Sequence, residues 1–404
     1  MSRSRVRPNA QFVVSIGAFL ALTGVLLQVG CASGPAGSRQ QGQAELVEGA
    51  PHYGDETTLQ FEDMSPEIIF GPYSRTDEMA EAFSQERAVR FLDRVATDWG
   101  KKYQCVTCHT NGYYLTAPPE IFAGRPAFLE ARQQAESFVD AWDEVTPDSI
   151  LAVLGYVAAP ETYVVATAAF LAINDAAAGR EPGDATLRAL DRAWRTQHEE
   201  GYWTDWIVCN WPPFESDLHY GVTLMAIAVG MSPDSSLQTD RSREGMKRVL
   251  SYLRKHPPTE IHQKGMMLWA GRYNEGLVNE ADRGRWIDEL FGLQRPDGAW
   301  ASGDLGRWRQ RDGERADPLV TVESDGYGTG FVLYVLMQGG VPASDPRIQK
   351  GIDWLKTNQR SGGHWWTQSL RNNSDTMNFL THTGTTFALK ALVASGSYGK
   401  VAAR

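Results

Sequence analysis

Three copies of one short spacing constrain the fold of this chain more than any other feature. Gln197, Gln294 and Gln359 are each followed four residues later by a glycine and six residues later by a tryptophan, in "QHEEGYW", "QRPDGAW" and "QRSGGHW". A repeated spacing is typical of architectures in which each repeat is one supersecondary unit that buries its apolar face against its neighbours. The chain is therefore predicted to consist of stacked copies of one unit.

Each copy lies between two segments of different character. Amphipathic segments such as "ATLRALDRAWRT" precede the glutamine, and apolar segments rich in small residues, such as "HYGVTLMAIAVG", follow the tryptophan. A helix with one apolar stripe faces a core on one side, whereas a helix that is apolar all round is buried. The unit is therefore predicted to be a helical hairpin with an outer and an inner member, and the glycine suits the left-handed cap of the outer helix.

Looser copies of the same pattern complete a set of six hairpins. The units are expected to start near residues 86, 129, 184, 242, 283 and 346. Six hairpins with apolar inner helices predict an all-α fold, an (α/α)6 toroid whose inner helices form a closed ring. An open solenoid is the alternative, because a sequence does not show closure.

The Gln-x-x-x-Gly-x-Trp spacing resembles the QW repeat of squalene–hopene cyclases and other terpenoid cyclases. The segments "SDGYGTGFVLYVL" and "GVPASDPRIQKGIDWLKTNQ" are also similar to the C-terminal half of that family. The resemblance covers about residues 85–398 and implies an α/α toroid that encloses an apolar cavity. Full cyclases carry two helical domains, and this chain has room for one.

The first 31 residues are predicted to be an export leader or membrane anchor. Three arginines in the first seven residues precede an apolar run at 12–30, which is the order found in a secretory signal. The run is also long enough to cross a bilayer as an uncleaved helix. Cys31 resembles the lipidated cysteine of bacterial lipoproteins, although Gln28 departs from that pattern. We therefore expect an exported protein on the periplasmic side that is attached to the membrane through its N-terminus.

Residues 32–84 are predicted to be a flexible spacer and lead-in segment, because their first part is rich in Gly, Ser, Gln and Ala. Residues 85–404 are predicted to form the toroid domain, with the first hairpin at its start. The net charge of the whole chain is −10, and a nucleic-acid surface needs clustered Lys and Arg. Nucleic acid is therefore not expected as a partner.

The most specific chemical motif is "CVTCH", formed by Cys105, Cys108 and His109. C-x-x-C-H is the signature of c-type haem attachment. Two thiols bond the haem vinyl groups, and the adjacent histidine is held as an axial ligand of the iron. Zinc is the alternative cofactor, with Cys209 or another histidine completing the ligand set, and a Cys105–Cys108 disulfide is a further reading. We expect haem c in the first hairpin.

Histidines recur at equivalent places in other hairpins. In a toroid all inner helices begin at the same end, so their first residues share one rim, where helix N-termini favour anionic groups. His219, His262 and His382 lie at three of these starts. Each alone would be read as a cap or a packing residue, but together with His109 they predict a haem or metal site. His219, His262 or His382 is the candidate second axial ligand.

Asp325, in "ESDGYG", is the candidate catalytic residue of the alternative function. Cyclases of the resembled class protonate a double bond with the middle aspartate of D-x-D-D, and that motif does not occur in this chain. An apolar cavity raises the pKa of a carboxyl group, so Asp325 could act as a general acid. The same residue also precedes a predicted inner helix, and a helix cap is the preferred interpretation.

These features predict an exported, haem-c-carrying, squalene-cyclase-like protein with a redox role. The role is either electron transfer to a partner protein or oxidation of a hydrophobic small molecule held in the toroid. The alternatives are a terpenoid-cyclase-like, prenyltransferase-like or zinc-dependent enzyme, and a non-catalytic isoprenoid-binding module.

Overall fold

The computed structural model describes residues 71–103, 106–141, 160–204, 206, 212–214, 217–308, 323–370 and 378–398. All of them belong to one compact unit that spans Leu46–Arg404. The predicted leader, its lipidation site at Cys31 and most of the spacer lie outside the described residues. Within the described ranges, no helix is long and apolar enough to cross a membrane.

The described residues form helices that alternate between an outer and an inner layer. The outer helices are α2 (Gln85–Tyr103), α5 (Pro126–Ala141), α8 (Asp184–Thr196), α10 (Asp240–Lys255), α12 (Glu280–Gly292) and α14 (Pro346–Thr357). The inner helices are α3 (Asn111–Tyr114), α7 (Pro160–Ala177), α9 (Leu218–Met231), α11 (Ile261–Gly271), α13 (Gly326–Gln338) and α15 (Leu380–Ala394). Each outer helix begins within a few residues of its predicted start.

The two layers follow from the apolar patterns of the helices. The outer helix α8 buries one stripe, which includes Leu190 and Trp194, and exposes charged residues on its other side. The inner helix α9 is buried along nearly its whole length. A helix with no polar face can be accommodated only inside, so the order of outer and inner members is set by composition.

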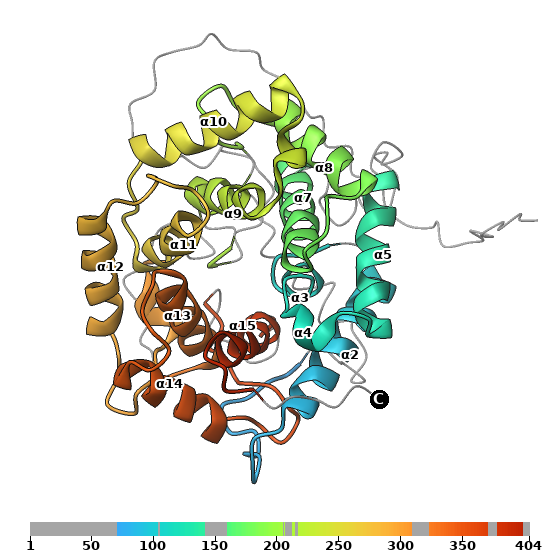
Figure 1. The fold of residues 1–404 in the computed structure, drawn as a ribbon. Coiled ribbons are helices and arrows are strands. Elements are labelled where there is room, and N and C mark those ends of the chain that lie inside the picture. Colours follow the sequence, from blue (N-terminus) through green and yellow to red (C-terminus); the bar gives the residue numbers. More distant parts are fainter. Residues whose placement is uncertain are drawn as a thin grey trace, which may run out of the picture. The chain divides into compact units, whose positions relative to one another are not determined.

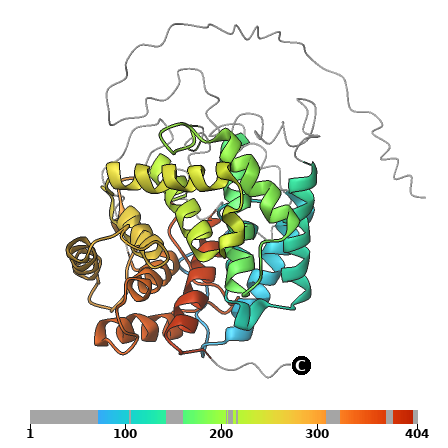
Figure 2. The same cartoon turned by 45° about the horizontal axis from the view of Figure 1, so that its top comes forward.

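The ring is closed. The inner helix α15 contacts α2 and α3 of the first hairpin, and α3 in turn contacts α7. The remaining inner helices follow in order, α7 beside α9, then α11, α13 and α15, as Figure 1 and the turned view in Figure 2 show. The predicted α/α toroid is therefore confirmed, and the open solenoid is not the arrangement found.

The three repeated corners have one geometry. The ring N–H of Trp203 donates to the backbone oxygen of Ala193, ten residues earlier in the last turn of the preceding outer helix, at 2.9 Å. Trp300 and Trp365 do the same at equivalent positions, each at 2.7 Å. A buried indole N–H needs an acceptor, so the tryptophan seals the end of the outer helix where its last carbonyl groups lack intrahelical partners.

The glutamine of each corner joins one hairpin to the next. Its side-chain amide donates to the oxygen of its own repeat's glycine. It also donates to a backbone oxygen in the next outer helix or directly before that helix. Those second acceptors are Gly245 for Gln197, Arg347 for Gln294 and Ser84 for Gln359. The last of these contacts joins the sixth hairpin to the first, so the repeat signature also closes the ring.

The first inner helix is much shorter than the others. α3 has four residues and is followed by a second short helix, α4 (Pro119–Phe122). Two short 3-10 helices, η2 (Asp234–Leu237) and η3 (Ser302–Leu305), complete the described elements. Residues 106–110, directly before the short α3, are not helical.

Aromatic rings meet in the middle of the inner ring. Phe387 of α15 contacts Tyr113 of α3, Trp269 of α11, and Tyr327 and Phe331 of α13. Because α3 and α11 lie on opposite sides of the ring order, these contacts cross its centre. Aromatic side chains therefore occupy part of the centre where we expected an enclosed apolar cavity.

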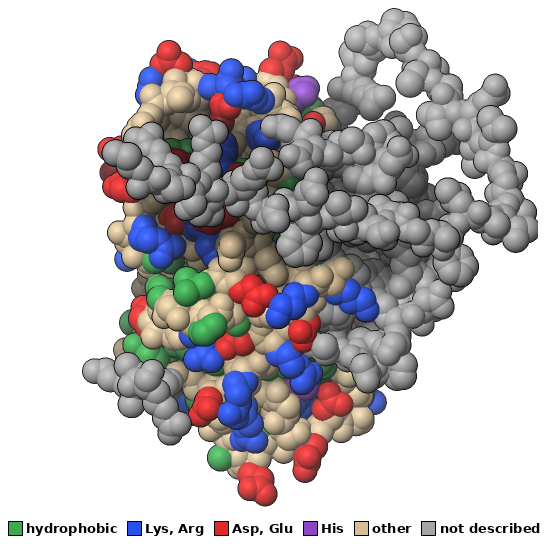
Figure 3. Space-filling view, turned by 90° about the vertical axis from the view of Figure 1, so that its right-hand side faces the viewer, with side chains coloured by type: hydrophobic (Ala, Val, Ile, Leu, Met, Phe, Trp, Pro, Cys, Tyr) green, Lys and Arg blue, Asp and Glu red, His purple; other side chains and the backbone are tan. Residues whose placement is uncertain are grey.

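The outer surface carries charges of both signs. On the face that Figure 3 shows, basic and acidic side chains are interspersed over the described residues. Arg188 of α8 pairs with Asp140 of α5, and Arg241 of α10 pairs with Asp191 of α8. Pairs between neighbouring outer helices suit a solvated exterior, where each contributes little to stability.

Candidate functional site

Residues 106–109 of the CxxCH motif lie at the rim, just before the start of α3. Cys108 and His109 are both buried, with 2% and 8% of their surfaces exposed. The backbone N–H of Thr107 donates to Oδ1 of Asn111 at 2.9 Å, and Gly112 donates to the oxygen of Thr107 at 3.0 Å. A Cβ on Gly112 would lie 2.5 Å from that oxygen. The sequence following the motif therefore holds the loop tightly against the helix. Cys105 lies outside the described residues.

Three neighbours fix the ring of His109. Phe379 stacks on it with ring centres 4.9 Å apart, and Trp99 packs edge-on at 4.8 Å. Oγ1 of Thr110 lies 2.9 Å from its Nδ1. Contacts on the ring face and at Nδ1 restrict rotation about both side-chain bonds, which is the kind of support that orients a ligating histidine.

His382 lies next to this site, on the last inner helix. Its Nδ1 is 2.9 Å from the same Thr110 hydroxyl, and its Nε2 is 3.1 Å from the hydroxyl of Tyr73. Thr383, the next residue, donates to the backbone oxygen of His109 at 2.8 Å. Burial and the neighbouring imidazoles of His109 and His364 hold the pKa of His382 well below its usual value. His382 is therefore neutral at pH 7.

Of the other two candidate ligands, His262 lies in a second aromatic cluster, and His219 lies at the start of the neighbouring inner helix α9. Nε2 of His262 is 2.8 Å from the hydroxyl of Tyr327, and its ring stacks on Phe331 at 4.5 Å. Burial lowers the pKa of His262 to about 3. Nδ1 of His219 is 3.0 Å from the Thr223 hydroxyl, and burial also lowers the pKa of His219.

Buried tyrosines lie between the two clusters. The hydroxyls of Tyr113 and Tyr220 are 2.6 Å apart, and burial raises the pKa of both. Cys108 lies close enough to both tyrosines to influence these pKa values further. The Tyr113–Tyr220 contact therefore links α3 to α9, where Tyr220 directly follows His219.

The structure brings some of the predicted site residues together and leaves others apart. His109 and His382 share the hydroxyl of Thr110. His262 contacts the rings of Tyr220 and Tyr327. Burial and, to a smaller extent, the neighbouring His219 lower the pKa of His262. Cys209 and Cys105 lie outside the described residues. In the ranges that are described, no three His, Cys, Asp or Glu side chains are grouped as a metal site would require.

Asp325 caps α13. Its Oδ1 accepts from the N–H of Gly328 at 2.8 Å, and its Oδ2 accepts from the N–H and hydroxyl of Ser302 at 2.8 and 2.7 Å. The side chain is fully buried, and burial raises the pKa of Asp325 to about 6 even though these three hydrogen bonds favour the carboxylate. Both oxygens are engaged with backbone and serine donors.

Several residues of the site were not predicted from the sequence. Thr110 follows the CxxCH motif directly but belongs to no motif, and Tyr73 falls in the segment assigned to the spacer and lead-in. His364 lies in the last repeated corner, where its Nε2 is 3.2 Å from Asp77. Lys390 is buried in α15. Of these, Lys390 had a visible signal, since it is the lone charge in the apolar segment "THTGTTFALKALVASG".

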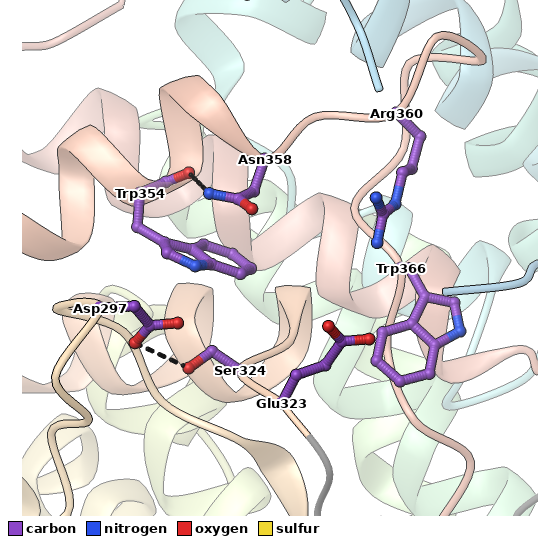
Figure 4. Close-up of a pocket in the computed structure, with 7 residues that line it drawn as sticks. All are labelled: Asp297, Glu323, Ser324, Trp354, Asn358, Arg360 and Trp366. Carbon is purple, nitrogen blue, oxygen red and sulfur yellow. Dashed lines mark hydrogen bonds between the residues drawn. The ribbon is translucent and has the colours of Figure 1, made fainter. Parts of the chain in front are cut away.

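A small pocket lies at the corner between the fifth and sixth hairpins (Figure 4). Trp354 and Asn358 lie on one side of it, and Asp297 accepts a hydrogen bond from Ser324 at 3.0 Å on another. Glu323, Arg360 and Trp366 complete the lining. Its lining carries charges of both signs and shares no residue with the set described around His109.

The closed ring and its QW-type corners define a squalene-cyclase-like α/α toroid. The chain is 32% identical over 144 residues to the squalene–hopene cyclase of Bradyrhizobium diazoefficiens. The match covers 35% of this chain and 19% of that relative, so the chain matches about a fifth of the cyclase's length. No protein-family model matches the chain.

Proposed function

We propose that this chain is a haem-c-carrying redox protein built on a squalene-cyclase-like toroid. The observation that carries the proposal is the placement of Cys108 and His109, side by side at the start of the first inner helix, with the His109 ring held by Thr110, Trp99 and Phe379. A CxxCH histidine fixed in this way fits an axial ligand, because its orientation is set before the metal is bound.

The residues present fit the chemistry of the group. Cys105 and Cys108 would hold haem covalently through their thiols, and His109 would be the axial ligand. When bound, haem supplies one-electron chemistry. The protein supplies a buried aromatic surround of low polarity, and burial together with hydrogen bonding around the iron sets the reduction potential. His219, His262 and His382 are the candidate second ligands, and alanine variants would show which of them changes the iron spin state.

Export belongs to the same proposal. Covalent haem attachment in bacteria takes place outside the cytoplasm, and residues 1–31 have the charge and hydropathy order of a leader. A partner would then be a redox protein or a hydrophobic small molecule on the periplasmic side, with the membrane reached through the N-terminus. Fractionation of cells that express the full chain tests this step, since a cytoplasmic product would contradict it.

The test of the main proposal is expression with a haem c maturation system, followed by a reduced absorption spectrum. A covalent haem spectrum that is lost in Cys105→Ala/Cys108→Ala supports the proposal. A colourless wild-type protein overturns it. Metal analysis of the same sample would then decide whether zinc occupies the CxxCH segment, with Cys209 or a further histidine as the remaining ligand.

A terpenoid-cyclase-like activity is the second candidate, favoured by the 144-residue similarity to a squalene–hopene cyclase. Asp325 would be its general acid, since burial raises the pKa of this carboxyl to about 6. Incubation with squalene-like substrates should then give a product that Asp325→Asn abolishes. Absence of product from the folded wild-type chain removes this candidate.

A further inference from the structure

Four buried side chains form a line across the seam where the ring closes. Oγ1 of Thr110 lies 2.9 Å from Nδ1 of His109 and 2.9 Å from Nδ1 of His382. Nε2 of His382 lies 3.1 Å from the hydroxyl of Tyr73. Less than a tenth of the surface of each of the four residues is exposed. The hydrogen atoms in these contacts are therefore supplied by the four side chains and not by bulk water.

The hydroxyl of Thr110 limits how the hydrogens can be arranged. It has one hydrogen to donate and two lone pairs, and a neutral imidazole carries one N–H. If neither Nδ1 carried hydrogen, one contact would place two lone pairs against each other. If both did, the buried Thr110 hydrogen would have no acceptor, which is costly. One imidazole therefore donates to Thr110 and the other accepts from it.

Two directions satisfy this condition. In the first, Nδ1–H of His109 donates to Thr110, Thr110 donates to Nδ1 of His382, and Nε2–H of His382 donates to Tyr73. In the second, every hydrogen bond is reversed and His109 carries its hydrogen on Nε2. A metal ligand must present a lone pair, and the nitrogen that binds is set by the hydrogen bond that the other nitrogen makes. Only the first direction leaves the lone pair of His109 on Nε2.

We infer that Thr110 and His382 are positioning residues that set the tautomer of His109, through hydrogen bonds running from His109 to Thr110, His382 and Tyr73. The direction of these hydrogen bonds rests on the proposed haem function. The coupling of the two imidazoles through Thr110 does not. In this assignment His382 accepts the hydrogen bond from Thr110 and thereby orients His109, and it is not itself an iron ligand.

The chain of hydrogen bonds has a measurable consequence for the iron. Donation from Nδ1 raises the basicity of a ligating histidine, and a more basic ligand stabilises the ferric state and lowers the reduction potential. Thr110 accepts more strongly while it donates onward to His382, because hydrogen bonds in a chain polarise one another. Removing either link should therefore raise the potential.

Thr383 provides a matched control in the same neighbourhood. Its hydroxyl donates to the backbone oxygen of His109 at 2.8 Å, so Thr383→Val removes a buried hydrogen bond to the same residue without touching the chain of four. In the full chain with haem attached, we expect Thr110→Val to raise the reduction potential, Thr110→Ser to restore it, and Thr383→Val to leave it unchanged. Equal potentials in wild type and Thr110→Val, or an equal shift in Thr383→Val, would overturn the inference.

A second readout does not need haem. Nitrogen-15 shifts of the histidine rings distinguish Nδ1–H from Nε2–H, and the haem-free full chain can be labelled at histidine. Thr110→Val should change the tautomer populations of His109 and His382 together, while Thr383→Val changes neither. If Thr110→Val changes the tautomers of both histidines but the protein attaches no haem, only the haem proposal is overturned. If haem is attached but the histidine nitrogen-15 shifts do not change in Thr110→Val, only the inferred hydrogen bonds between His109, Thr110 and His382 are overturned.

Discussion

Gln359, in the last repeated corner, forms a two-way hydrogen-bonded pair with the backbone of Ser84, just before the first outer helix. Its Nε2 donates to the oxygen of Ser84 at 2.9 Å, and its Oε1 accepts from the N–H of Ser84 at 2.7 Å. These two residues lie 275 positions apart in the chain. The ring is thus closed by the same glutamine that joins neighbouring hairpins elsewhere.

Gln359→Leu should destabilise the fold by about 2–4 kcal/mol, because it leaves the half-buried N–H of Ser84 and the buried oxygen of Gly363 without partners. The measurement is urea unfolding followed by circular dichroism. Gln238 is exposed, so Gln238→Leu is the control and should change the free energy of unfolding by less than about 0.5 kcal/mol. An equal decrease in the free energy of unfolding in the two variants would show that the Gln359–Ser84 hydrogen bonds do not stabilise the fold.

Gly363→Ala should be more destabilising than an ordinary substitution at a left-handed glycine. Gly363 has φ of 98°, and a Cβ there would lie 2.3 Å from the backbone oxygen of Arg87. Gly276 has φ of 70° with open space around it, so Gly276→Ala measures the conformational cost alone, about 1–2 kcal/mol. We expect Gly363→Ala to cost at least about 2 kcal/mol more. Similar unfolding midpoints would contradict the close approach of α2 to this corner.

Lys390 should give the protein a distinctive stability profile at alkaline pH. Its Nζ donates to the oxygen of Thr116 at 3.1 Å and lies 4.6 Å from the ring centres of Trp269 and Tyr334. Burial lowers the pKa of Lys390 from 10.5 to about 7. Between these values the unfolded chain binds a proton that the folded chain does not, so the contribution of Lys390 to the free energy of unfolding rises with pH.

Unfolding in urea between pH 6 and 10 tests this expectation. The free energy of unfolding of Lys390→Met should not rise between about pH 7 and 10. Relative to wild type, this variant should be most stable at or below pH 7, where wild type bears the full cost of burying the lysine charge. Lys247 is 77% exposed, and Lys247→Met should follow the wild-type profile. Parallel profiles for wild type and Lys390→Met would refute the lowered pKa.

The hairpin order could be predicted from the sequence because it depends on local composition. The starts of α8 and α14 fall on the predicted residues 184 and 346, since an amphipathic stripe and a following Gly–Trp corner are both visible in one short segment. The same spacing predicted a corner at Gln359 but not its partner. Ser84 carries no signal of its own, because the contact depends on closure of the ring.

The details of the site depend even more on long-range packing. His109 and His382 were both predicted to lie on one rim, and a shared hydroxyl now links them. Neither Thr110 nor Tyr73 could be foreseen as the link, because each meets its partner only when the last inner helix reaches the first hairpin. The short α3 was also missed, since an apolar segment does not reveal where its helix ends.

Asp325→Asn should destabilise the fold even though asparagine is ordinarily as good a helix cap as aspartate. Both carboxylate oxygens of Asp325 accept from donors in a fully buried site, so an amide NH2 group must face one of those donors. We expect a loss of about 1–3 kcal/mol in urea unfolding. Asp345 caps α14 at the surface, and Asp345→Asn should cost less than about 1 kcal/mol. An Asp325→Asn protein as stable as wild type would mean that Asp325 is not held as a cap.

Covalent attachment of haem to the CxxCH motif can be read from the mass of one tryptic peptide. Trypsin cuts after Lys102 and next after Arg132, because Pro126 blocks cleavage after Arg125, and it releases a segment that contains Cys105, Cys108 and His109. When the full chain is expressed with a haem c maturation system, we expect this peptide to carry the mass of one haem. A peptide with two free thiols or one disulfide from that same preparation would contradict it.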